Sequence, residues 1–306
     1  NSVSWGTNFI DVTITDVNNE AIENALVTLL KGDDEIFTSV LTNSQGEATI
    51  LLDYQSGGEV YLTVTKKDCI PIEESFQIIQ VDDNINLSTN DITIMDESND
   101  VTNGNADGNL NPGEIVYLNL PLINYGNSTA NNVQCTLTSE SDLVNVIYGI
   151  NQYNDFNPGE IGYQLSNYII EITQNALDGQ DLQLRLSITS TDGSWDSIVP
   201  VNLYGGNLFV DHIQYLNNLE LHPGEEGELA VYLSNNGSID LEDVSIELLP
   251  SGTLVDIIQP YANFGTIASG STVQSSNNNP LRVFINGNTI NGSNLNVNAN
   301  LLSSNG

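Results

Sequence analysis

PGEIVYLNLPLINYG (residues 112–126) and PGEEGELAVYLSNNG (residues 223–237) are two versions of one stretch, 111 residues apart. In both, Pro-Gly-Glu opens an apolar run and an Asn-x-Gly turn closes it. A run that alternates apolar and polar residues between such turns predicts a β-strand. Because the interval has the length of a domain, the two stretches predict a tandem array of like modules.

Further landmarks follow the same offset. The matching pairs are Val133 and Val244, Gly159 and Gly270, and, with a slip of two residues, Leu182 and Leu295. Apolar stretches along the whole chain alternate with period two, and none keeps a helical period over three turns. The sequence therefore predicts an all-β chain of three tandem antiparallel β-sandwiches of immunoglobulin-like type in an extended rod. The domains are expected at residues 1–88, 89–205 and 206–306.

The charge of the chain is one-sided, with 5 Lys and Arg against 40 Asp and Glu, a net of −35. Binding to nucleic acid or to an anionic membrane needs a basic surface, so the net charge argues against both. An acidic surface attracts divalent cations and keeps a protein soluble. Few lysines with many Asp, Asn, Ser and Thr are typical of a secreted bacterial surface protein, so an extracellular or cell-surface location is expected. No run of eighteen apolar residues occurs, and membrane insertion is not expected.

The end of the third module and the start of the chain suggest how copies could associate. The second module closes with an alternating strand at residues 195–201, but residues 206–306 contain no counterpart of it. The chain opens with a strand around Trp5 that has no obvious sheet of its own. A sandwich that lacks a strand has an open edge that another segment can fill. The connection Gly205-Gly206 is only two residues long, which favours a stiff link to the third module.

We therefore expect self-association into a polymer or tandem array, with the first segment of one copy added to the third module of another. The residues expected at this interface are Trp5, Phe9, Ile10 and Val12 on one side and Leu295, Val297 and Leu301 on the other. The alternative is that the polypeptide continues past Gly306 and supplies its own last strand.

One loop of the second module has the composition of a calcium site. Calcium takes six to eight oxygen ligands on a tightly turning backbone, and Gly104 and Gly108 allow such a turn. The spacing is not that of an EF-hand. The alternative is a polar turn that leads into a strand. The expected ligands are Asp96, Asp100, Asp107, Asn109, Asn111 and Glu114.

No arrangement that would make this chain an enzyme is visible. Both histidines, His212 and His222, fall in the third module, and no Gly-x-Ser-x-Gly elbow, phosphate loop or dinucleotide motif is present. A zinc site would need clustered His and Cys residues, and none are clustered. We expect no catalytic residue.

The modules also resemble known types. Residues 12–27, 42–48 and 61–66 resemble the immunoglobulin-like domain that follows the catalytic domain of gingipain-type cysteine peptidases. The two later modules resemble the CARDB-like (cell-adhesion-related) sandwiches of secreted Bacteroidota proteins. In such modules the acidic Gly/Asn loop before Pro-Gly-Glu is often a calcium site, and the third module has lost it. The catalytic residues of the peptidases have no match in this chain.

Together these observations predict an extracellular structural module of a surface fibre, filament or adhesin, rigidified by Ca²⁺. A cell-surface or glycan ligand is a further expectation. Two alternatives stay open: an accessory stalk of a secreted cysteine peptidase, and a carbohydrate-binding module, which would need exposed coplanar aromatic side chains.

Overall fold

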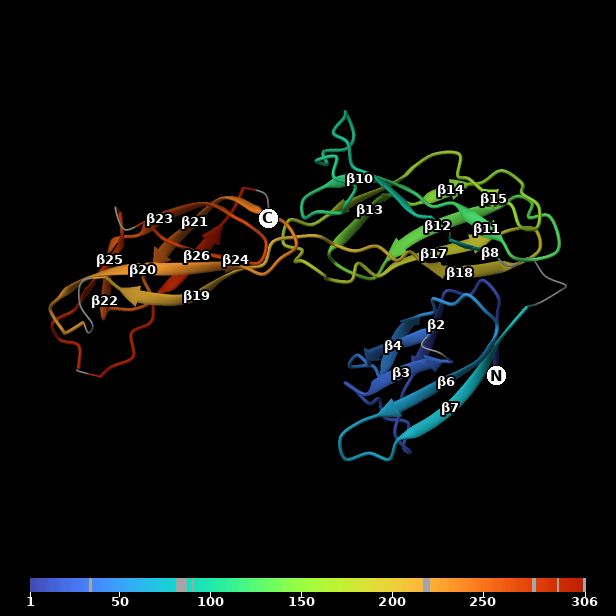
Figure 1. The fold of residues 1–306 in the computed structure, drawn as a ribbon, viewed down its shortest axis with the longest axis horizontal. Coiled ribbons are helices and arrows are strands. Elements are labelled where there is room, and N and C mark those ends of the chain that lie inside the picture. Colours follow the sequence, from blue (N-terminus) through green and yellow to red (C-terminus); the bar gives the residue numbers. More distant parts are fainter. Residues whose placement is uncertain are drawn as a thin grey trace. The chain divides into compact units, whose positions relative to one another are not determined.

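A computed structural model describes residues 1–32, 35–80, 87–89, 91–216, 221–276, 279–290 and 292–304. Within these ranges the regular structure is entirely β-strand, in several mostly antiparallel sheets (Figure 1). The prediction of an all-β sandwich chain is confirmed. No helix occurs in the described part of the chain, so none there is long and apolar enough to cross a bilayer.

The first sandwich packs a five-stranded sheet, in the order β1-β7-β6-β3-β4, against the two-stranded sheet β2-β5. Its strands are β1 (Ser2–Ser4), β2 (Phe9–Thr13), β3 (Leu26–Lys31), β4 (Ile36–Leu41), β5 (Glu47–Leu51), β6 (Gly58–Thr65) and β7 (Ile72–Ile79). Alternate residues point inward, so Val27 and Leu29 on β3 and Ile50 on β5 are fully buried in one core.

The second sandwich is built from sheets in the orders β13-β16-β10-β9, β15-β11-β8 and β14-β12-β17-β18. Its strands are β8 (Leu87–Thr89), β9 (Thr93–Met95), β10 (Ile115–Asn119), β11 (Leu122–Asn124), β12 (Gln134–Ser139), β13 (Val144–Tyr148), β14 (Ile150–Gln152), β15 (Ile161–Gly162), β16 (Tyr168–Ile172), β17 (Leu184–Thr189) and β18 (Ser194–Ile198). The core is mainly aliphatic but includes the aromatic side chains of Tyr153, Phe156 and Tyr168. The Tyr153 hydroxyl donates to the Leu120 carbonyl at 2.6 Å and lies 3.2 Å from the Tyr168 hydroxyl.

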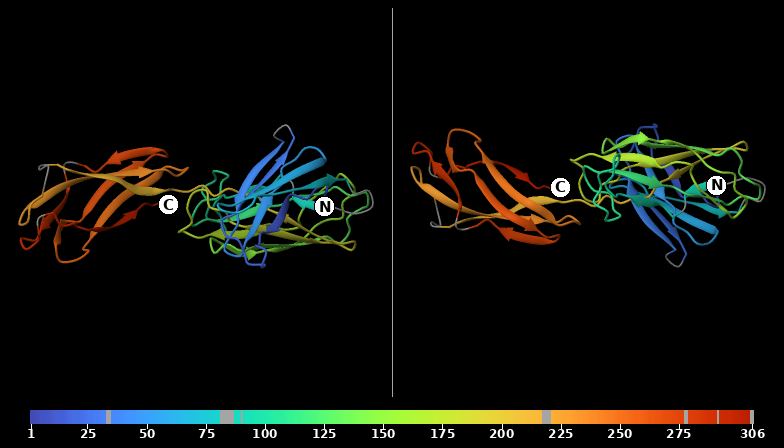
Figure 2. Two further views of the ribbon diagram at one scale, coloured as in Figure 1. Left: turned by 90° about the horizontal axis from the view of Figure 1, so that it is seen from below. Right: turned by 90° about the horizontal axis from the view of Figure 1, so that it is seen from above.

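The third sandwich pairs the sheet β19-β20-β25-β22, with β24 also on β20, against the sheet β23-β21-β26 (Figure 2). Its strands are β19 (Leu208–Tyr215), β20 (Glu226–Asn235), β21 (Leu241–Leu249), β22 (Val255–Gln259), β23 (Tyr261–Ile267), β24 (Ser271–Gln274), β25 (Leu281–Ile285) and β26 (Asn298–Leu302). Of the expected interface residues, Leu301 lies on β26, whereas Leu295 and Val297 precede it, and Val297 packs against the core from there.

The internal repeat holds at the level of single hydrogen bonds. Gly113 N–H donates to the Ile172 carbonyl at 3.0 Å, and Gly224 N–H donates to the Ile285 carbonyl at 2.8 Å. The donors differ by 111 residues and the acceptors by 113, which is the slip of two residues predicted from the sequence. The second and third sandwiches are therefore two copies of one strand arrangement.

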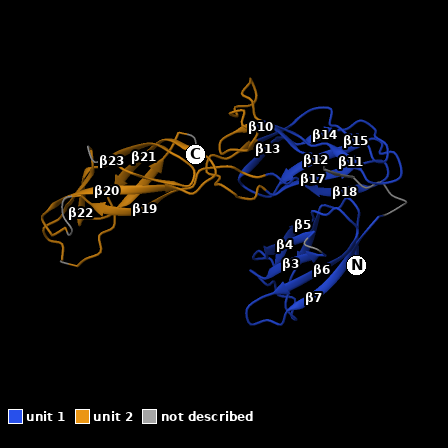
Figure 3. Ribbon diagram, in the orientation of Figure 1, with its two compact units in different colours: residues 1–95, 116–170, 183–201 blue, residues 96–115, 171–182, 202–306 orange. Residues whose placement is uncertain are grey.

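The chain divides into two compact units (Figure 3). The first comprises Asn1–Met95, Val116–Ile170 and Gln183–Val201, and the second comprises Asp96–Ile115, Glu171–Leu182 and Asn202–Gly306. The acidic loop, residues 96–114, and the segment that leads into the third sandwich, residues 202–207, thus belong to the same unit. β8 pairs with β11, so residues 87–89 belong to the second sandwich.

Candidate functional site

The acidic loop folds around the buried carboxylate of Asp96. One carboxylate oxygen of Asp96, Oδ2, accepts hydrogen bonds from the main-chain N–H of Asp107 at 2.9 Å and of Gly108 at 3.2 Å. Gly108 adopts φ +79°, a left-handed conformation that favours glycine, so the chain can turn back here. Gly104 packs with its Cα against the Asp96 main chain, where a Cβ would lie 2.0 Å from the carbonyl oxygen. Gly108 thus allows the turn that the sequence predicts, and Gly104 allows two main-chain segments to lie close together.

Glu114 closes the other end of the loop. Its Oε1 accepts from Asn105 N–H at 3.1 Å and its Oε2 from Asn111 N–H at 3.0 Å. The side chain is buried, and burial, together with the nearby Asp96 and Asp107 carboxylates, raises the pKa of Glu114 to about 7. A carboxylate in this position is poorly solvated, so a positive counter-charge would stabilise its ionised form.

The structure brings some of the predicted calcium ligands together and leaves one apart. The amide of Asn105, which the sequence analysis did not single out, donates to Asn111 Oδ1 at 3.0 Å and links it to Asp107. Asn109 contributes a main-chain N–H to Asp107 Oδ1 at 2.8 Å. Asp100 is exposed on a separate turn. Among the described residues no three His, Cys, Asp or Glu side chains form a group that could hold a metal ion. The calcium site stays a prediction.

The loop also fixes the segment that leads into the third sandwich. Asn111 Nδ2 donates to the Tyr204 carbonyl at 2.9 Å, and Tyr204 N–H donates to the Leu110 carbonyl at 2.9 Å. Leu110 and Leu203, both fully or almost fully buried, form a parallel β-bridge. One side of this segment is therefore paired like a strand of a sheet.

The other side of the segment is held by the turn that ends β20. Gly205 N–H donates to Asp178 Oδ1 at 3.0 Å, and the same oxygen accepts from the Ser238 hydroxyl. Ser238 N–H donates back to the Gly205 carbonyl at 3.0 Å, and Asn236 N–H to the Asn207 carbonyl at 2.9 Å. We call residues 203–207, with their partners in the acidic loop, at Asp178 and at residues 235–238, the joint.

Two glycines allow close contacts in the joint, one with a main chain and one with a side chain. A Cβ on Gly237 would lie 2.3 Å from the Gly205 carbonyl oxygen and 2.6 Å from the Asn207 nitrogen. A Cβ on Gly206 would lie 2.3 Å from a methyl carbon of Leu241. Real Cβ contacts are longer than this. At Gly237 the neighbouring atoms are main-chain atoms, so only glycine fits there, whereas at Gly206 the Leu241 side chain would have to move. The sequence predicted a short connection at Gly205-Gly206, but it gave no sign of Asp178 or Ser238 as partners.

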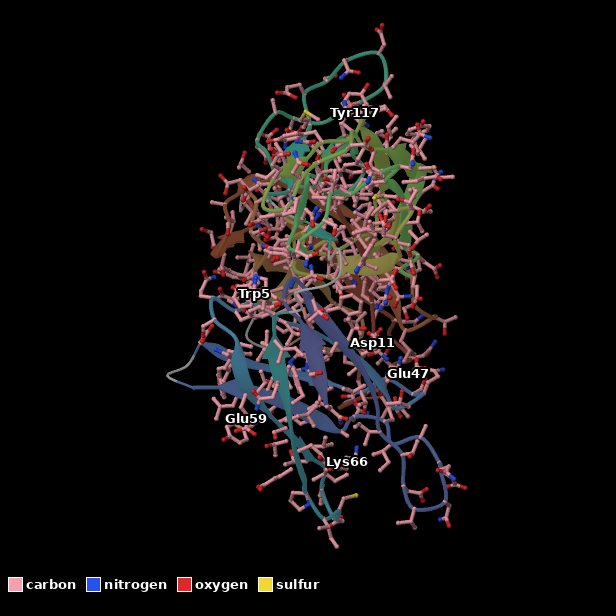
Figure 4. All side chains as sticks on the ribbon, turned by 90° about the vertical axis from the view of Figure 1, so that its right-hand side faces the viewer. Trp5, Asp11, Glu47, Glu59, Lys66 and Tyr117 are labelled. Atoms are coloured by element: carbon pink, nitrogen blue, oxygen red, sulfur yellow. The ribbon has the colours of Figure 1, made fainter. Side chains whose placement is uncertain are left out.

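The N-terminal stretch that was expected to add to another copy is already paired within the first sandwich. β1 runs parallel to β7, β2 pairs with β5, and Trp5 N–H donates to the Ile79 carbonyl at 2.7 Å. Trp5, labelled in Figure 4, packs its ring within this sandwich. Its ring meets the Tyr54 ring edge-on at a centroid distance of 5.1 Å. The expectation that this stretch lacks a sheet of its own is wrong, because a parallel pairing of three residues leaves no signature in the sequence.

Other residues of this stretch contact the second sandwich within the first unit. Asn8 Nδ2 donates to the Ile198 carbonyl at 2.8 Å, and Ile198 N–H donates to Asn8 Oδ1 at 3.1 Å. The Arg185 guanidinium lies 4.6 Å from the centroid of the Phe9 ring and 3.0 Å from Asp11 Oδ2. The side-chain amide of Asn8 thus pairs with both main-chain groups of Ile198 on β18, as a neighbouring strand would. Phe9, Ile10 and Val12 have their partners inside the chain.

Comparison with known proteins adds little to this picture. No family model matches the chain, and no curated protein matches it. Among solved structures it is similar to the I-band fragment I67–I69 of titin (11% identity, 93% of this chain and 85% of that chain, TM-score 0.23). It is also similar to the secreted serine protease VesC of Vibrio cholerae (10%, 96% and 76%, TM-score 0.24) and to BcpA, the major pilin subunit of Bacillus cereus (13%, 91% and 85%, TM-score 0.21). Alignments with such scores carry no argument, and the fold rests on the strand pairing itself.

Proposed function

We propose that this chain is a structural segment of an extracellular surface fibre or adhesin, whose task is to hold successive β-sandwiches in a fixed order. The observation that supports this proposal is the joint. Both main-chain groups of Tyr204, Gly205 and Asn207 are hydrogen-bonded, to the acidic loop, to Asp178 and to the turn at residues 235–238.

A connection built in this way behaves differently from a flexible linker. Glycine-containing linkers without partners sample a broad range of end-to-end distances. In the joint, by contrast, bending would break several hydrogen bonds at once, and each buried group left unpaired costs about 1–3 kcal/mol. A protein that needed only a tether between two sandwiches would not need these partners.

The proposal is tested by measuring a distance across the joint. Spin labels at Asn175→Cys and Ser251→Cys, both exposed positions of the second unit, are placed in a chain that carries Cys69→Ser. We expect a narrow distance distribution. Insertion of Gly-Ser-Gly-Ser between Gly205 and Gly206 serves as the control and should broaden it. A distribution in the uninserted chain as broad as that in the inserted chain would contradict the proposal.

Calcium binding by the acidic loop is a second part of the proposal. The donor set at Asp96, Asn111 and Glu114 is of the hard-oxygen type that Ca²⁺ prefers. Burial, with the nearby Asp96 and Asp107 carboxylates, raises the pKa of Glu114, and a positive charge beside it would favour the ionised carboxylate. A bound Ca²⁺ would supply that charge and would stiffen the loop against the joint.

Addition of about 10 mM Ca²⁺ at pH 8 is therefore expected to stabilise the loop by roughly 2 kcal/mol, if its affinity is that of extracellular calcium modules. At pH 5, below the folded-state pKa of Glu114, the carboxyl group is protonated and the effect should disappear. Thermal unfolding with Ca²⁺ and with chelator measures this.

Glu114→Gln should abolish the calcium effect. The chain offers a matched control, because Asn157-Pro-Gly-Glu160 repeats Asn111-Pro-Gly-Glu114, and Asn157 N–H donates to Glu160 Oε2 at 2.9 Å. Glu160→Gln removes the same negative charge from the matching turn outside the acidic loop and should leave the calcium effect intact. If neither variant changed the response, the loop would not be the calcium site.

A further inference from the structure

The outer face of the first sandwich carries exposed apolar side chains in the middle of a sheet. In the five-stranded sheet, β3 lies between β4 and β6 (Figure 1). Leu30 on β3 lies directly opposite Phe37 on β4 and directly opposite Tyr61 on β6. The residue that precedes each of the three is buried in the core, so these side chains point to the other face of the sheet. They are 42%, 74% and 52% exposed.

The three side chains form a line across the strands, and we call Leu30, Phe37 and Tyr61 the strip. Phe37 and Tyr61 stand two strands apart, so their main chains are separated by about 9.6 Å. The solvated face of an antiparallel sheet is usually polar. A row of one aliphatic and two aromatic side chains on such a face therefore indicates a binding surface.

Hydroxyl groups separate the strip from a second apolar row. Thr28 lies directly opposite Ser39 and Thr63, and beyond this row Leu26 lies opposite Leu41 on the same face. The apolar side chains thus stand in lines with hydroxyls between them, and not in one continuous patch. A stable protein interface takes about 20–30 residues on each side, which such lines do not supply. The strip therefore suits a narrow ligand.

Carboxylates at one end of the strip decide the charge of that ligand. Glu59 Oε2 accepts from the Tyr61 hydroxyl at 3.0 Å, and Glu59 Oε1 accepts from the Ser75 hydroxyl at 2.9 Å. Glu73 follows on β7, two residues from Ser75 on the same face. In the described strands of this sheet the single Lys or Arg is Lys31, whose side chain is buried. The strip therefore repels anionic ligands, including a second copy of this chain, with its net charge of −35.

We propose that the strip binds a neutral, extended, β-linked glycan that lies across the strands. A pyranose ring packs its C–H face on apolar and aromatic side chains, and the hydroxyls at its rim donate to carboxylates. The separation of Phe37 and Tyr61 is close to one disaccharide repeat of such a chain. Alternate sugars would stack on the two rings, with Leu30 beneath the sugar between them, and Glu59 would fix the orientation of the ligand. This site goes beyond the proposed structural role and does not depend on the joint.

The test is a calorimetric titration of the chain of residues 1–306 with cellohexaose, chitohexaose and mannohexaose, three neutral β-linked hexasaccharides. We expect at least one of them to bind. Its affinity should be the same at about 1 M salt as in dilute buffer, because screening does not weaken the contacts of an uncharged ligand. Hexagalacturonate, an anionic hexasaccharide, should not bind.

Matched variants locate the site. Tyr61→Ala, at a position 52% exposed, should fold normally and weaken binding at least about tenfold. Tyr163→Ala makes the same change at a position 54% exposed on the second sandwich and should leave binding unchanged. Tyr61→Phe keeps the ring and removes only the hydroxyl that donates to Glu59, so it should bind more tightly than Tyr61→Ala. Phe37→Ala removes the other ring and should weaken binding as Tyr61→Ala does.

Four outcomes overturn the proposal: no neutral hexasaccharide binds, hexagalacturonate binds as tightly as the neutral ones, Tyr61→Ala and Tyr163→Ala weaken binding equally, or Tyr61→Ala and Phe37→Ala both leave it unchanged. Urea unfolding of each variant shows that a loss of binding is not a loss of fold. None of the four outcomes affects the distance measurement across the joint.

Discussion

Gly237→Ala is expected to lower the free energy of unfolding of the third sandwich by about 3 kcal/mol, the upper end of the range for overpacking. The added methyl carbon would lie 2.3 Å from the Gly205 carbonyl oxygen, 2.6 Å from the Asn207 nitrogen and 2.7 Å from the Gly206 carbonyl carbon. All three are main-chain atoms, so no side chain can rotate away to make room. The turn at residues 235–238 and the segment at 203–207 must separate instead.

Separation of the two segments has a second consequence besides stability. The hydrogen bonds from Ser238 N–H to the Gly205 carbonyl and from Asn236 N–H to the Asn207 carbonyl would lengthen or break. We therefore expect faster proteolysis within residues 203–207 and a broader spin-label distance distribution across the joint. Both readouts report on the joint and not only on the core of the sandwich.

Gly287→Ala is the control for this substitution. Gly287 lies in the same sandwich, has nothing within 4 Å of an added Cβ, and does not adopt a positive φ. It should change stability by less than about 0.5 kcal/mol, as surface substitutions usually do. Equal stability of the two variants in urea unfolding would show that the close approach at Gly237 is relieved without cost, which the structure does not suggest.

The repeated parts of the fold were predictable because they rest on local patterns. Alternation of apolar residues marks the strands, and the two Pro-Gly-Glu and Asn-x-Gly landmarks set the offset of the two copies. Even the slip of two residues is real, since it separates Ile172 from Ile285 as hydrogen-bond acceptors of Gly113 and Gly224. A pattern read twice in one chain is more informative than the same pattern read once.

The contacts between distant segments were not predictable in this way. Asp178 lies in a loop whose composition gives no reason to expect a partner at Gly205 or Ser238, and the pairing exists only because the fold brings these turns together. β1 was missed for a similar reason, because its three residues pair with residues 77–79 of β7, which come at the other end of the first sandwich in the sequence. Of the acidic loop, the sequence indicated Asp96 and Glu114, but the linking role of Asn105 depends on how the loop closes.

The second large expected effect is the loss of stability when a buried asparagine is replaced. It can be tested twice, because such an asparagine ends the strand that follows each Pro-Gly-Glu. Asn124 is fully buried, donates to the Ser128 and Phe156 carbonyls at 2.8 and 3.3 Å, and accepts from Gly126 N–H at 2.9 Å. Asn124→Ala leaves the Ser128 carbonyl and the Gly126 N–H without this partner, whereas the Phe156 carbonyl keeps a hydrogen bond from Ala130 N–H at 2.9 Å. Each of the two groups left without a partner costs about 1–3 kcal/mol, so a loss of about 4 kcal/mol from the second sandwich is expected.

Asn235 makes the same contacts in the third sandwich, to the Ile239 and Ile267 carbonyls at 2.8 and 3.1 Å and from Gly237 N–H at 3.0 Å. Its Oδ1 accepts one further hydrogen bond, from Asn207 N–H in the joint at 3.3 Å. Asn235→Ala should therefore match Asn124→Ala in its effect on its own sandwich and, unlike it, should broaden the distance distribution across the joint.

Aspartate at the same positions separates the two roles, because Asn235→Asp keeps the acceptor oxygen for Asn207 N–H and Gly237 N–H but loses both donated hydrogen bonds. Asn235→Asp should destabilise the third sandwich, while the distance distribution across the joint should stay narrow at low temperature. Segment-resolved hydrogen exchange measures each sandwich separately, as a chain of several domains requires. If Asn124→Ala and Asn235→Ala broadened the distance distribution across the joint equally, the amide of Asn235 would not be the group that couples the end of β20 to residue 207. The fixed joint would then rest on its other contacts, among them those of Asp178 and the close approach at Gly237.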